Sequence, residues 1–260
     1  MAMYQKEFEL TQKTAMAVGR YLLRMSQTGF RVSFKGKIDP VTEADTGAER
    51  LIISAIRKNF PEDDILTEET ADQRRRSERR WIIDPLDGTT NFSHRFPFWC
   101  VSIAFEHQER IQAGAVYSPI LGELFTARRG GGAFLNGRRI HVSHQASLKR
   151  CLLATGFPYD VHTSRNDNLK YFRRFIKRAQ AVRRPGSAAM DLAYVACGRF
   201  DGFWEMKLKP WDMAAGALLV EEAGGRVTDF AGKRFSIYKP ECLASNGWVH
   251  GIMKKILIGR

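Results

Sequence analysis

The segment with the clearest chemical content combines a short apolar run with two aspartates. Trp81-Ile82-Ile83 predicts a buried strand, which ends where Pro85 forces the chain to turn. Asp84 ends this strand and Asp87 follows three residues on, close enough for both carboxylates to face one point. Hard cations such as Mg²⁺ take oxygen ligands, and two such ions can share carboxylates during hydrolysis of a phosphate ester.

The residues after Asp87 fit the same chemistry. Gly88 allows a tight backbone, and Thr89 opens a predicted helix whose first N–H groups can hold phosphate oxygens. The alternative is a turn in which Asp84 and Asp87 only cap the next helix. The spacing of the two aspartates alone favours that alternative, whereas the whole string of residues 81–92 favours a metal site.

Three more acidic residues stand at the ends of predicted elements. Glu68 follows a short apolar strand, Asp45 precedes a helix, and Asp212 lies where a helix begins after a Lys-Pro-Trp sequence. Each also has a purely structural explanation, Glu68 as a solvated strand end and the two aspartates as helix caps. A capping role for Asp212 is compatible with metal binding, and Thr89 could likewise be an ordinary cap.

Hydrophobic periodicity predicts a single α/β unit over residues 1–260. The first half is predicted to contain helices at 10–25 and 48–56, strands at 65–67 and 81–83, and a β-rich stretch at 99–140. The second half is predicted to contain helices at 168–178, 188–197, 213–223 and 249–256, and strands at 202–206, 226–229 and 242–245. The approximate halves are 1–145, with the large sheet and most candidate ligands, and 146–260, which contributes Asp212.

Composition excludes several protein classes. The chain is 44% hydrophobic and 27% charged, as in a globular protein, and it contains no apolar run of membrane-spanning length. Its first residues lack the pattern of a secretory signal, so we expect a cytoplasmic protein without a membrane partner. The four cysteines are far apart and are expected to be free thiols, neither zinc ligands nor disulfides.

The net charge of +13 arises from 41 Lys+Arg against 28 Asp+Glu. Such a balance favours anionic partners, including nucleic acid and phosphorylated metabolites. The excess is spread along the chain, and no aromatic residues interleave regularly with the arginines as a stacking platform requires. A solvated basic surface is therefore favoured over a dedicated nucleic-acid site, which stays open as an alternative.

The 81–92 string resembles the metal-binding motif of the inositol monophosphatase family, closest to its bacterial branch. The resemblance extends from Val41-Thr42-Glu43-Ala44-Asp45 to Trp211-Asp212. It implies a layered αβαβα sugar-phosphatase fold, with two mixed or antiparallel sheets between helices. It also implies activation by Mg²⁺, inhibition by lithium and, usually, a homodimer.

The resemblance carries metal and catalytic roles onto particular residues. The implied metal ligands are Glu68, Asp84, the Leu86 carbonyl, Asp87 and Asp212, with Asp45 beside them. Glu68 and the Thr89 hydroxyl would orient the attacking water, with Asp87 completing the catalytic set. The N–H groups of Gly88 and Thr89 would hold the phosphate. Lys35 approximately matches a basic residue on a mobile loop, in an alignment that is one residue short.

Substrate-reading residues are implied in the second half. The Gly186-Ser187-Ala188 turn would contact substrate hydroxyls. Glu205 would accept hydrogen bonds from a polyol, and so would Asp87. A solvated strand terminus is the alternative for Glu205. Asp191 is expected to support packing or the backbone, and Arg184 to steer a second phosphate or to form an ion pair.

The function favoured by these residues is hydrolysis of inositol monophosphate, or a similar polyol or sugar phosphate, by metal-activated water. Alternative substrates within the same class are fructose 1,6-bisphosphate, histidinol phosphate and 3′-phosphoadenosine nucleotides. In a different class, the chain would be a regulatory module that binds RNA or RNA polymerase. None of the six histidines has metal-ligand spacing or a partnered nucleophile, so we expect no catalytic histidine.

Overall fold

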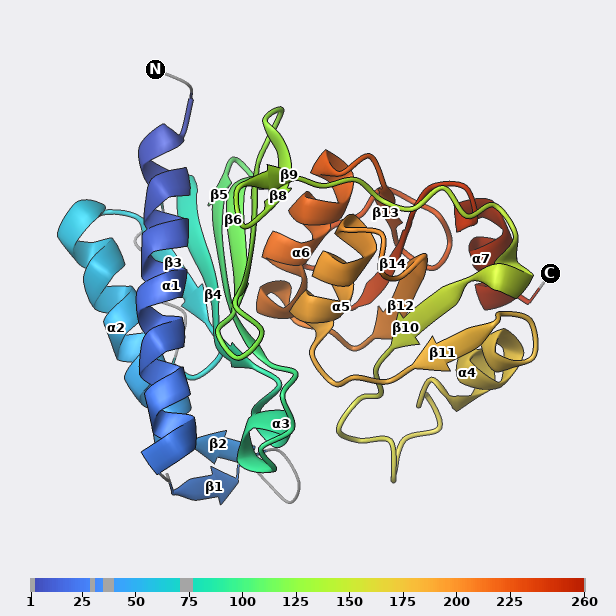
Figure 1. Cartoon of the computed structure of the whole chain (residues 1–260), viewed down its shortest axis with the longest axis horizontal. Coiled ribbons are helices and arrows are strands. Elements are labelled where there is room, and N and C mark those ends of the chain that lie inside the picture. The colour runs from blue at the N-terminus through green and yellow to red at the C-terminus, as the bar shows by residue number, and fades with distance from the viewer. Residues whose placement is uncertain (1–2, 29–30, 35–39, 71–76, 260) are drawn as a thin grey trace.

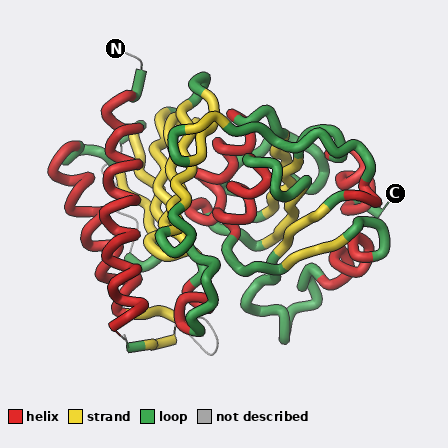
Figure 2. Tube along the Cα trace, viewed as in Figure 1, coloured by secondary structure: helices red, strands yellow, loops and turns green. Residues whose placement is uncertain are grey.

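The computed structural model describes residues 3–28, 31–34, 40–70 and 77–259. Lys35 lies outside these residues. Two helices, a seven-stranded sheet, two further helices, a five-stranded sheet and a last pair of helices follow one another across the molecule (Figure 1). Figure 2 shows the same alternation of helical and strand layers. The layered αβαβα architecture is therefore confirmed.

The elements of the first half are α1 (Gln5–Thr28), β1 (Val32–Phe34), β2 (Pro40–Thr42), α2 (Glu43–Asn59), β3 (Asp64–Thr67), β4 (Arg79–Asp87), α3 (Thr89–Ser93), β5 (Cys100–His107), β6 (Arg110–Ser118), β7 (Glu123–Arg128), β8 (Gly132–Leu135) and β9 (Arg138–Arg139). Those of the second half are the 3₁₀ helix η1 (Leu148–Arg150), β10 (Leu152–Thr155), α4 (Leu169–Ile176), β11 (Ala181–Arg183), α5 (Ala188–Ala196), β12 (Gly202–Met206), α6 (Pro210–Glu222), β13 (Arg226–Thr228), β14 (Glu241–Ser245) and α7 (His250–Leu257).

The seven-stranded sheet has the order β3-β4-β5-β6-β7-β8-β9 and is antiparallel except for the β3–β4 pair. Its two faces bury different side chains. Trp81 and Ile83 pack in the cluster that includes residues of α1 and α2, whereas Ile82 packs in the cluster that includes residues of α5 and α6. Because both faces are covered, the strand is apolar without alternation, as a doubly buried strand requires.

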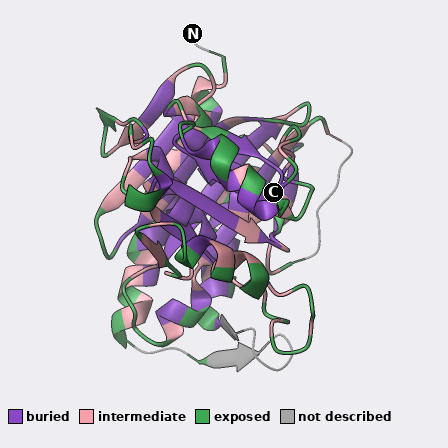
Figure 3. Cartoon of the chain, turned by 90° about the vertical axis from the view of Figure 1, so that its right-hand side faces the viewer, coloured by how far each residue is buried: buried purple, intermediate pink, exposed green. Residues whose placement is uncertain are grey.

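The five-stranded sheet has the order β11-β10-β12-β14-β13 and mixes parallel with antiparallel pairs. Phe203 faces the cluster around α5 and α6, and Trp204 faces the outer cluster with residues of α4 and α7. The Trp204 ring stacks on Phe175 with centroids 4.0 Å apart. The central strands of both sheets and the helices α5 and α6 are mostly buried (Figure 3).

Several predicted boundaries need correction. β4 does not stop at Asp84 but continues to Asp87, and α6 begins at Pro210, three residues before the predicted start. The strands β10 and β11 were not predicted, because they are only four and three residues long, too short for a periodicity to show. The expectation of free cysteines is confirmed. No helix in the described part of the chain has the length and apolarity of a bilayer-spanning segment.

Candidate active site

The end of β4 changes direction through an irregularity in its pairing with β5. Asp84 pairs with Ser102 and Asp87 with Cys100, so β4 carries one residue more than β5 over this interval. Such a bulge alters the direction in which side chains point. Asp84 is buried, and one of its carboxylate oxygens accepts a hydrogen bond from the Leu86 N–H at 3.1 Å.

Gly88 makes the turn from β4 into α3. Its φ of +96° lies in the left-handed region, and a Cβ there would approach the Phe98 carbonyl oxygen to 3.0 Å. Only glycine meets both conditions without strain. The chain then enters α3 at Thr89, as the sequence predicted.

Asp45 belongs to a capping box and is a neighbour of this turn. One carboxylate oxygen accepts the Thr42 N–H at 2.7 Å, in a capping box at the start of α2. The other lies 3.0 Å from the Thr89 hydroxyl, which also lies 3.0 Å from the Leu86 carbonyl oxygen. Burial raises the pKa of Asp45. Asp45 is thus the third residue of α2 in a capping box whose N-cap is Thr42, so the expectation that Asp45 precedes the helix as its cap was wrong by three residues. Its carboxylate lies against Thr89.

Asp87 links β4 to the start of α5. One of its carboxylate oxygens accepts the Ser187 O–H at 2.6 Å and the Ala189 N–H at 2.7 Å. Burial raises the pKa of Asp87 to about 6, although both hydrogen bonds favour its charged form. Ser187 is also the N-cap of α5, where its oxygen accepts the Met190 N–H. The predicted turn at residues 186–188 therefore contacts Asp87.

Asp212 is the third residue of α6, and its carboxylate accepts the Lys209 N–H at 2.7 Å. The N-cap itself is Lys209, so the N-cap explanation for Asp212 was wrong by three residues. Burial raises the pKa of Asp212, and the negative charges of Asp87 and Glu68 raise it further. Burial likewise raises the pKa of Asp84, reinforced by Glu68, Asp87 and Asp212.

These mutual effects make the four carboxylates one electrostatic cluster, which we call the acidic cluster: Glu68, Asp84, Asp87 and Asp212. Its members come from the end of β3, from β4 and from α6, at the boundary between the layers of the fold. Among the described residues, no three or more His, Cys, Asp and Glu side chains surround one point closely enough to hold a metal ion. The metal-ligand roles therefore stay predictions.

Glu205, in β12, lies over a glycine. A Cβ on Gly156 would come within 2.1 Å of a Glu205 carboxylate oxygen, so the carboxylate occupies the space of a missing side chain. Burial and, to a smaller extent, the charge of Asp87 raise the pKa of Glu205 to about 8, against the opposing effect of Arg184. Glu205 is half-buried, and it is therefore not the solvated strand terminus of the alternative explanation.

Two further residues, Asp191 and Asn91, lie near the acidic cluster and were not predicted as part of the site. Asp191 is buried, and its Oδ1 has no hydrogen-bond partner in the part of the chain that the structure describes. Burial and the charges of Glu205 and Asp87 raise its pKa. Its position four residues after Ser187, on the same helix face, was a signal in the sequence. The Asn91 amide donates to the carbonyls of Phe98 at 2.7 Å and Pro185 at 2.8 Å. No sequence pattern indicated that link.

Comparison with known proteins covers almost the whole chain. The model of the "Inositol monophosphatase family" matches residues 4–258. The chain is 43% identical to "Nus factor SuhB" of Pseudomonas aeruginosa over 93% of its length and 92% of that protein. It is 44% identical to "Inositol-1-monophosphatase" of Mesorhizobium japonicum, over 90% and 89%. The solved inositol monophosphatase of Anabaena superposes with a TM-score of 0.90 at 38% identity, covering 98% of this chain and 96% of that one.

Proposed function

The chain belongs to the inositol monophosphatase family, and we propose that it is a Mg²⁺-dependent phosphatase of inositol monophosphate or a similar polyol or sugar phosphate. The family supports phosphatase activity, and the identity of the substrate is the part that we propose. A relative at 44% identity bears the name "Inositol-1-monophosphatase", which supports inositol monophosphate as the substrate.

The observation that carries the proposal is the acidic cluster itself. Asp84 is buried and the other three members are half-buried, and the neighbouring charges raise the pKa values of Asp84 and Asp212. Taking several like charges out of water costs several kcal/mol per ion unless cations offset them. The donors are all oxygens, which fits Mg²⁺ better than softer metals. The candidate ligands are Glu68, Asp84, the Leu86 carbonyl, Asp87 and Asp212.

Bound Mg²⁺ would supply positive charge to the phosphate oxygens and lower the pKa of water. The remaining tasks belong to the chain. When the Thr89 O–H donates to Asp45, its oxygen lone pairs remain able to accept a hydrogen bond from a water molecule. Glu68 would accept the other hydrogen of that water and take its proton as the water attacks phosphorus. The N–H groups of Gly88 and Thr89, at the start of α3, would hold phosphate oxygens.

The polyol part of the substrate would lie against the second half of the chain. Glu205 and Asp87 carry oxygens that can accept hydrogen bonds from hydroxyl groups. The turn formed by Gly186, Ser187 and Ala188 lies next to Asp87, because Ser187 donates to it. The oxygens of Glu205 and Asp87 can accept hydrogen bonds from hydroxyl groups, whereas a fully ionised phosphate has no hydrogen to donate, so this part of the site favours a polyol monophosphate over a bisphosphate.

A direct assay tests the proposal. Phosphate release would be measured with Mg²⁺ from inositol 1-phosphate, fructose 1,6-bisphosphate, histidinol phosphate and 3′-phosphoadenosine 5′-phosphate. We expect turnover of inositol 1-phosphate, with little from the others. Asp87→Asn should abolish this turnover, because it neutralises a candidate metal ligand. Asp229→Asn is the matched control, because asparagine can still accept the Lys233 N–H that Asp229 accepts at 2.7 Å. Folded protein that is inactive on all four substrates with Mg²⁺ would contradict the proposal.

A second candidate function is a regulatory role in which the chain binds RNA or RNA polymerase. It is favoured by relatives that bear the name Nus factor and by the net charge of +13. Electrostatic binding to RNA weakens steeply as salt increases. Affinity for an RNA oligonucleotide at increasing salt tests this role, and the absence of binding at low salt would remove RNA as the partner.

A further inference from the structure

A cavity of about 740 Å³ lies at the other end of β4 from the acidic cluster. Glu106, which lines it, belongs to β5 and pairs with Arg80 near the start of β4, whereas Asp84 and Asp87 are at the end of the strand. At about 3.3 Å per residue, Arg80 and Asp87 are separated by roughly 20 Å along the strand. The cavity is therefore distinct from the candidate active site.

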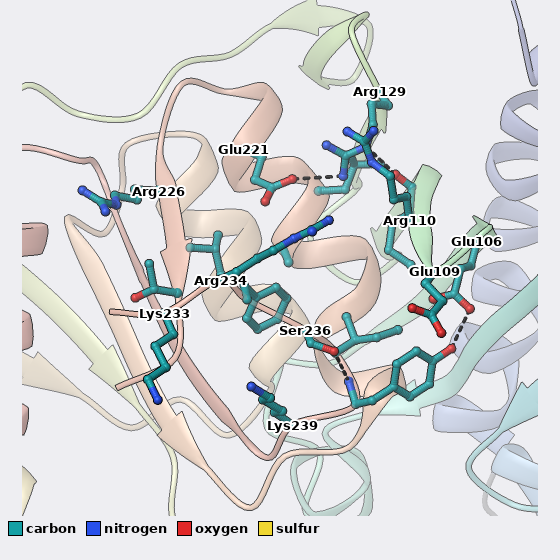
Figure 4. Close-up of a pocket in the computed structure, with 18 of the residues that line it drawn as sticks. Glu106, Glu109, Arg110, Arg129, Glu221, Arg226, Lys233, Arg234, Ser236 and Lys239 are labelled. Carbon is teal, nitrogen blue, oxygen red and sulfur yellow. Dashed lines mark hydrogen bonds and ion pairs between the residues drawn. The ribbon is translucent and has the colours of Figure 1, made fainter. Parts of the chain in front are cut away.

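One side of this cavity is strongly cationic. Arg110 opens β6, Arg129 follows β7, and Arg234 lies in the segment between β13 and β14. Figure 4 shows the Arg234 side chain extending towards the other two arginines. Arg129 forms an ion pair with Glu221 at 3.0 Å, while Arg110 and Arg234 form none with the described residues. Of these three guanidinium groups, which come from separate segments, only that of Arg129 forms an ion pair with a described carboxylate.

The other side presents a hydrogen-bond acceptor. Glu106 is only 4% exposed, and its Oε2 accepts the Tyr238 hydroxyl at 2.5 Å. Its Oε1 has no hydrogen-bond partner among the described residues. A buried polar atom without a partner is unfavourable, so a ligand N–H or O–H at this position would be stabilised. The Glu106–Tyr238 pair also lines a neighbouring hollow.

Between the two sides, the wall is apolar and partly aromatic. It includes Leu218 of α6, Val227 of β13, and Phe235 and Ile237 from the segment that carries Arg234. A volume of this size is typical of small-molecule sites, and much larger than one phosphate ion requires. A ligand that matches the cavity would be anionic at one end, flat and apolar in its middle, and rich in N–H donors at the other end.

We propose that this cavity binds a nucleoside phosphate, with its phosphate groups on Arg110, Arg129 and Arg234 and its base donating to Glu106. Guanidinium groups form paired, charge-assisted hydrogen bonds to phosphate. The base would lie along Phe235, and an N–H of the base would reach Oε1 of Glu106.

Calorimetric titration of the full chain with ADP, GDP and pyrophosphate tests this site. The titration is made in EDTA, because the acidic cluster without cations repels anions. We expect one nucleotide per chain, and binding weakened about tenfold or more by Arg234→Ala and by Arg110→Ala. Arg50→Ala is the matched control, since Arg50 is an exposed arginine of α2 outside the cavity.

Glu106→Gln separates the two ends of the ligand. It should weaken nucleotide binding about threefold or more and leave pyrophosphate binding unchanged, because only the nucleotide carries a base. Circular dichroism would confirm that this variant folds. Equal binding of nucleotide and pyrophosphate, with no effect of Glu106→Gln, would overturn the nucleoside assignment.

Three other results would overturn the proposal. The first is no binding of either nucleotide at millimolar concentration. The second is binding that Arg234→Ala and Arg110→Ala leave unchanged. The third is tighter binding of an RNA oligonucleotide that also depends on Arg234, since this would make the cavity part of a nucleic-acid surface.

Discussion

The paired strands β4 and β5 have acidic side chains at one end and the arginines of the cavity at the other. At one end the acidic cluster brings four carboxylates together, and burial and their mutual repulsion raise the pKa values of Asp84 and Asp212. At the other end the arginines of the cavity stay accessible, and two of the acids there, Glu106 and Glu221, accept from Tyr238 and Arg129. The first arrangement requires cations to be favourable, whereas the second requires an anion. The same sheet can therefore support two sites that need not share a ligand.

Asp212→Asn should give the largest difference between the two ends, because it should change phosphatase activity and leave nucleotide binding in the cavity unchanged. We expect phosphatase activity to fall about 100-fold or more, because one candidate ligand is neutralised where several kcal/mol of charge stabilisation are needed. Steady-state phosphate release at saturating Mg²⁺ measures this effect. Nucleotide binding in the cavity should not change, and a parallel loss there would indicate a general folding defect.

Gly156→Ala should weaken substrate binding by displacing the Glu205 carboxylate. The new Cβ would lie 2.1 Å from a Glu205 oxygen, so the carboxylate must move. We expect kcat/KM for the polyol phosphate to fall about tenfold, mostly through KM, since a binding contact is displaced. Gly251→Ala is the control, because a Cβ there meets nothing within 4 Å. An unchanged KM would remove Glu205 from the substrate contacts.

The stability of the metal-free chain should fall as pH rises from about 5 to 8. Folding raises the pKa of Asp87 to about 6 and of Glu205 to about 8, so both groups favour the folded state when protonated. Their contribution is fully present below the unfolded pKa values and is lost as pH rises through the folded ones. Melting temperatures in EDTA should drop by roughly 5 °C over this range.

Addition of Mg²⁺ provides the control for that pH dependence. If the acidic cluster holds the ion, Mg²⁺ should restore the melting temperature progressively more as pH rises, because more carboxylates are then charged. A melting temperature that responds equally to Mg²⁺ at pH 5 and pH 8 would contradict the assignment.

The smallest effect concerns the other end of the sheet. Tyr238→Phe removes the hydroxyl that donates to Glu106 and leaves a second oxygen of that carboxylate without its partner. We expect the free energy of unfolding to decrease by about 1 kcal/mol, measured by urea denaturation. Phosphatase activity should be unaffected, and any loss of it would couple the two ends of the sheet.

The sequence predicted the acidic end far better than the cationic end. Asp84, Asp87 and Gly88 lie in one continuous string, so local spacing alone brought them together. The arginines of the cavity are separated by up to 124 positions and are joined only by sheet pairing and by the packing of α6. The strands β10 and β11 were missed for a related reason, since three or four residues carry too little periodicity to identify a strand.

Side-chain partners were predicted least well. Asp45 was expected either as a cap or as a neighbour of the metal site, but the cap of α2 is Thr42, and Asp45 lies three residues later, where it bonds to Thr42 and Thr89. The contact between Asp87 and Ser187 joins residues 100 positions apart. The resemblance placed both residues in one site, but no spacing rule could assign the hydrogen bond between them.

The placement of α5 and α6 has a consequence for how the chain is synthesised. These helices cover one face of a sheet made entirely from earlier residues, and Asp212 follows Asp87 by 125 positions. At about 5–20 residues per second, the ribosome takes roughly 6–25 s to add that stretch. A sheet that formed before then would expose Ile82 and Phe125 on an uncovered face, so the first half of the chain cannot bury its core until α5 and α6 have been made.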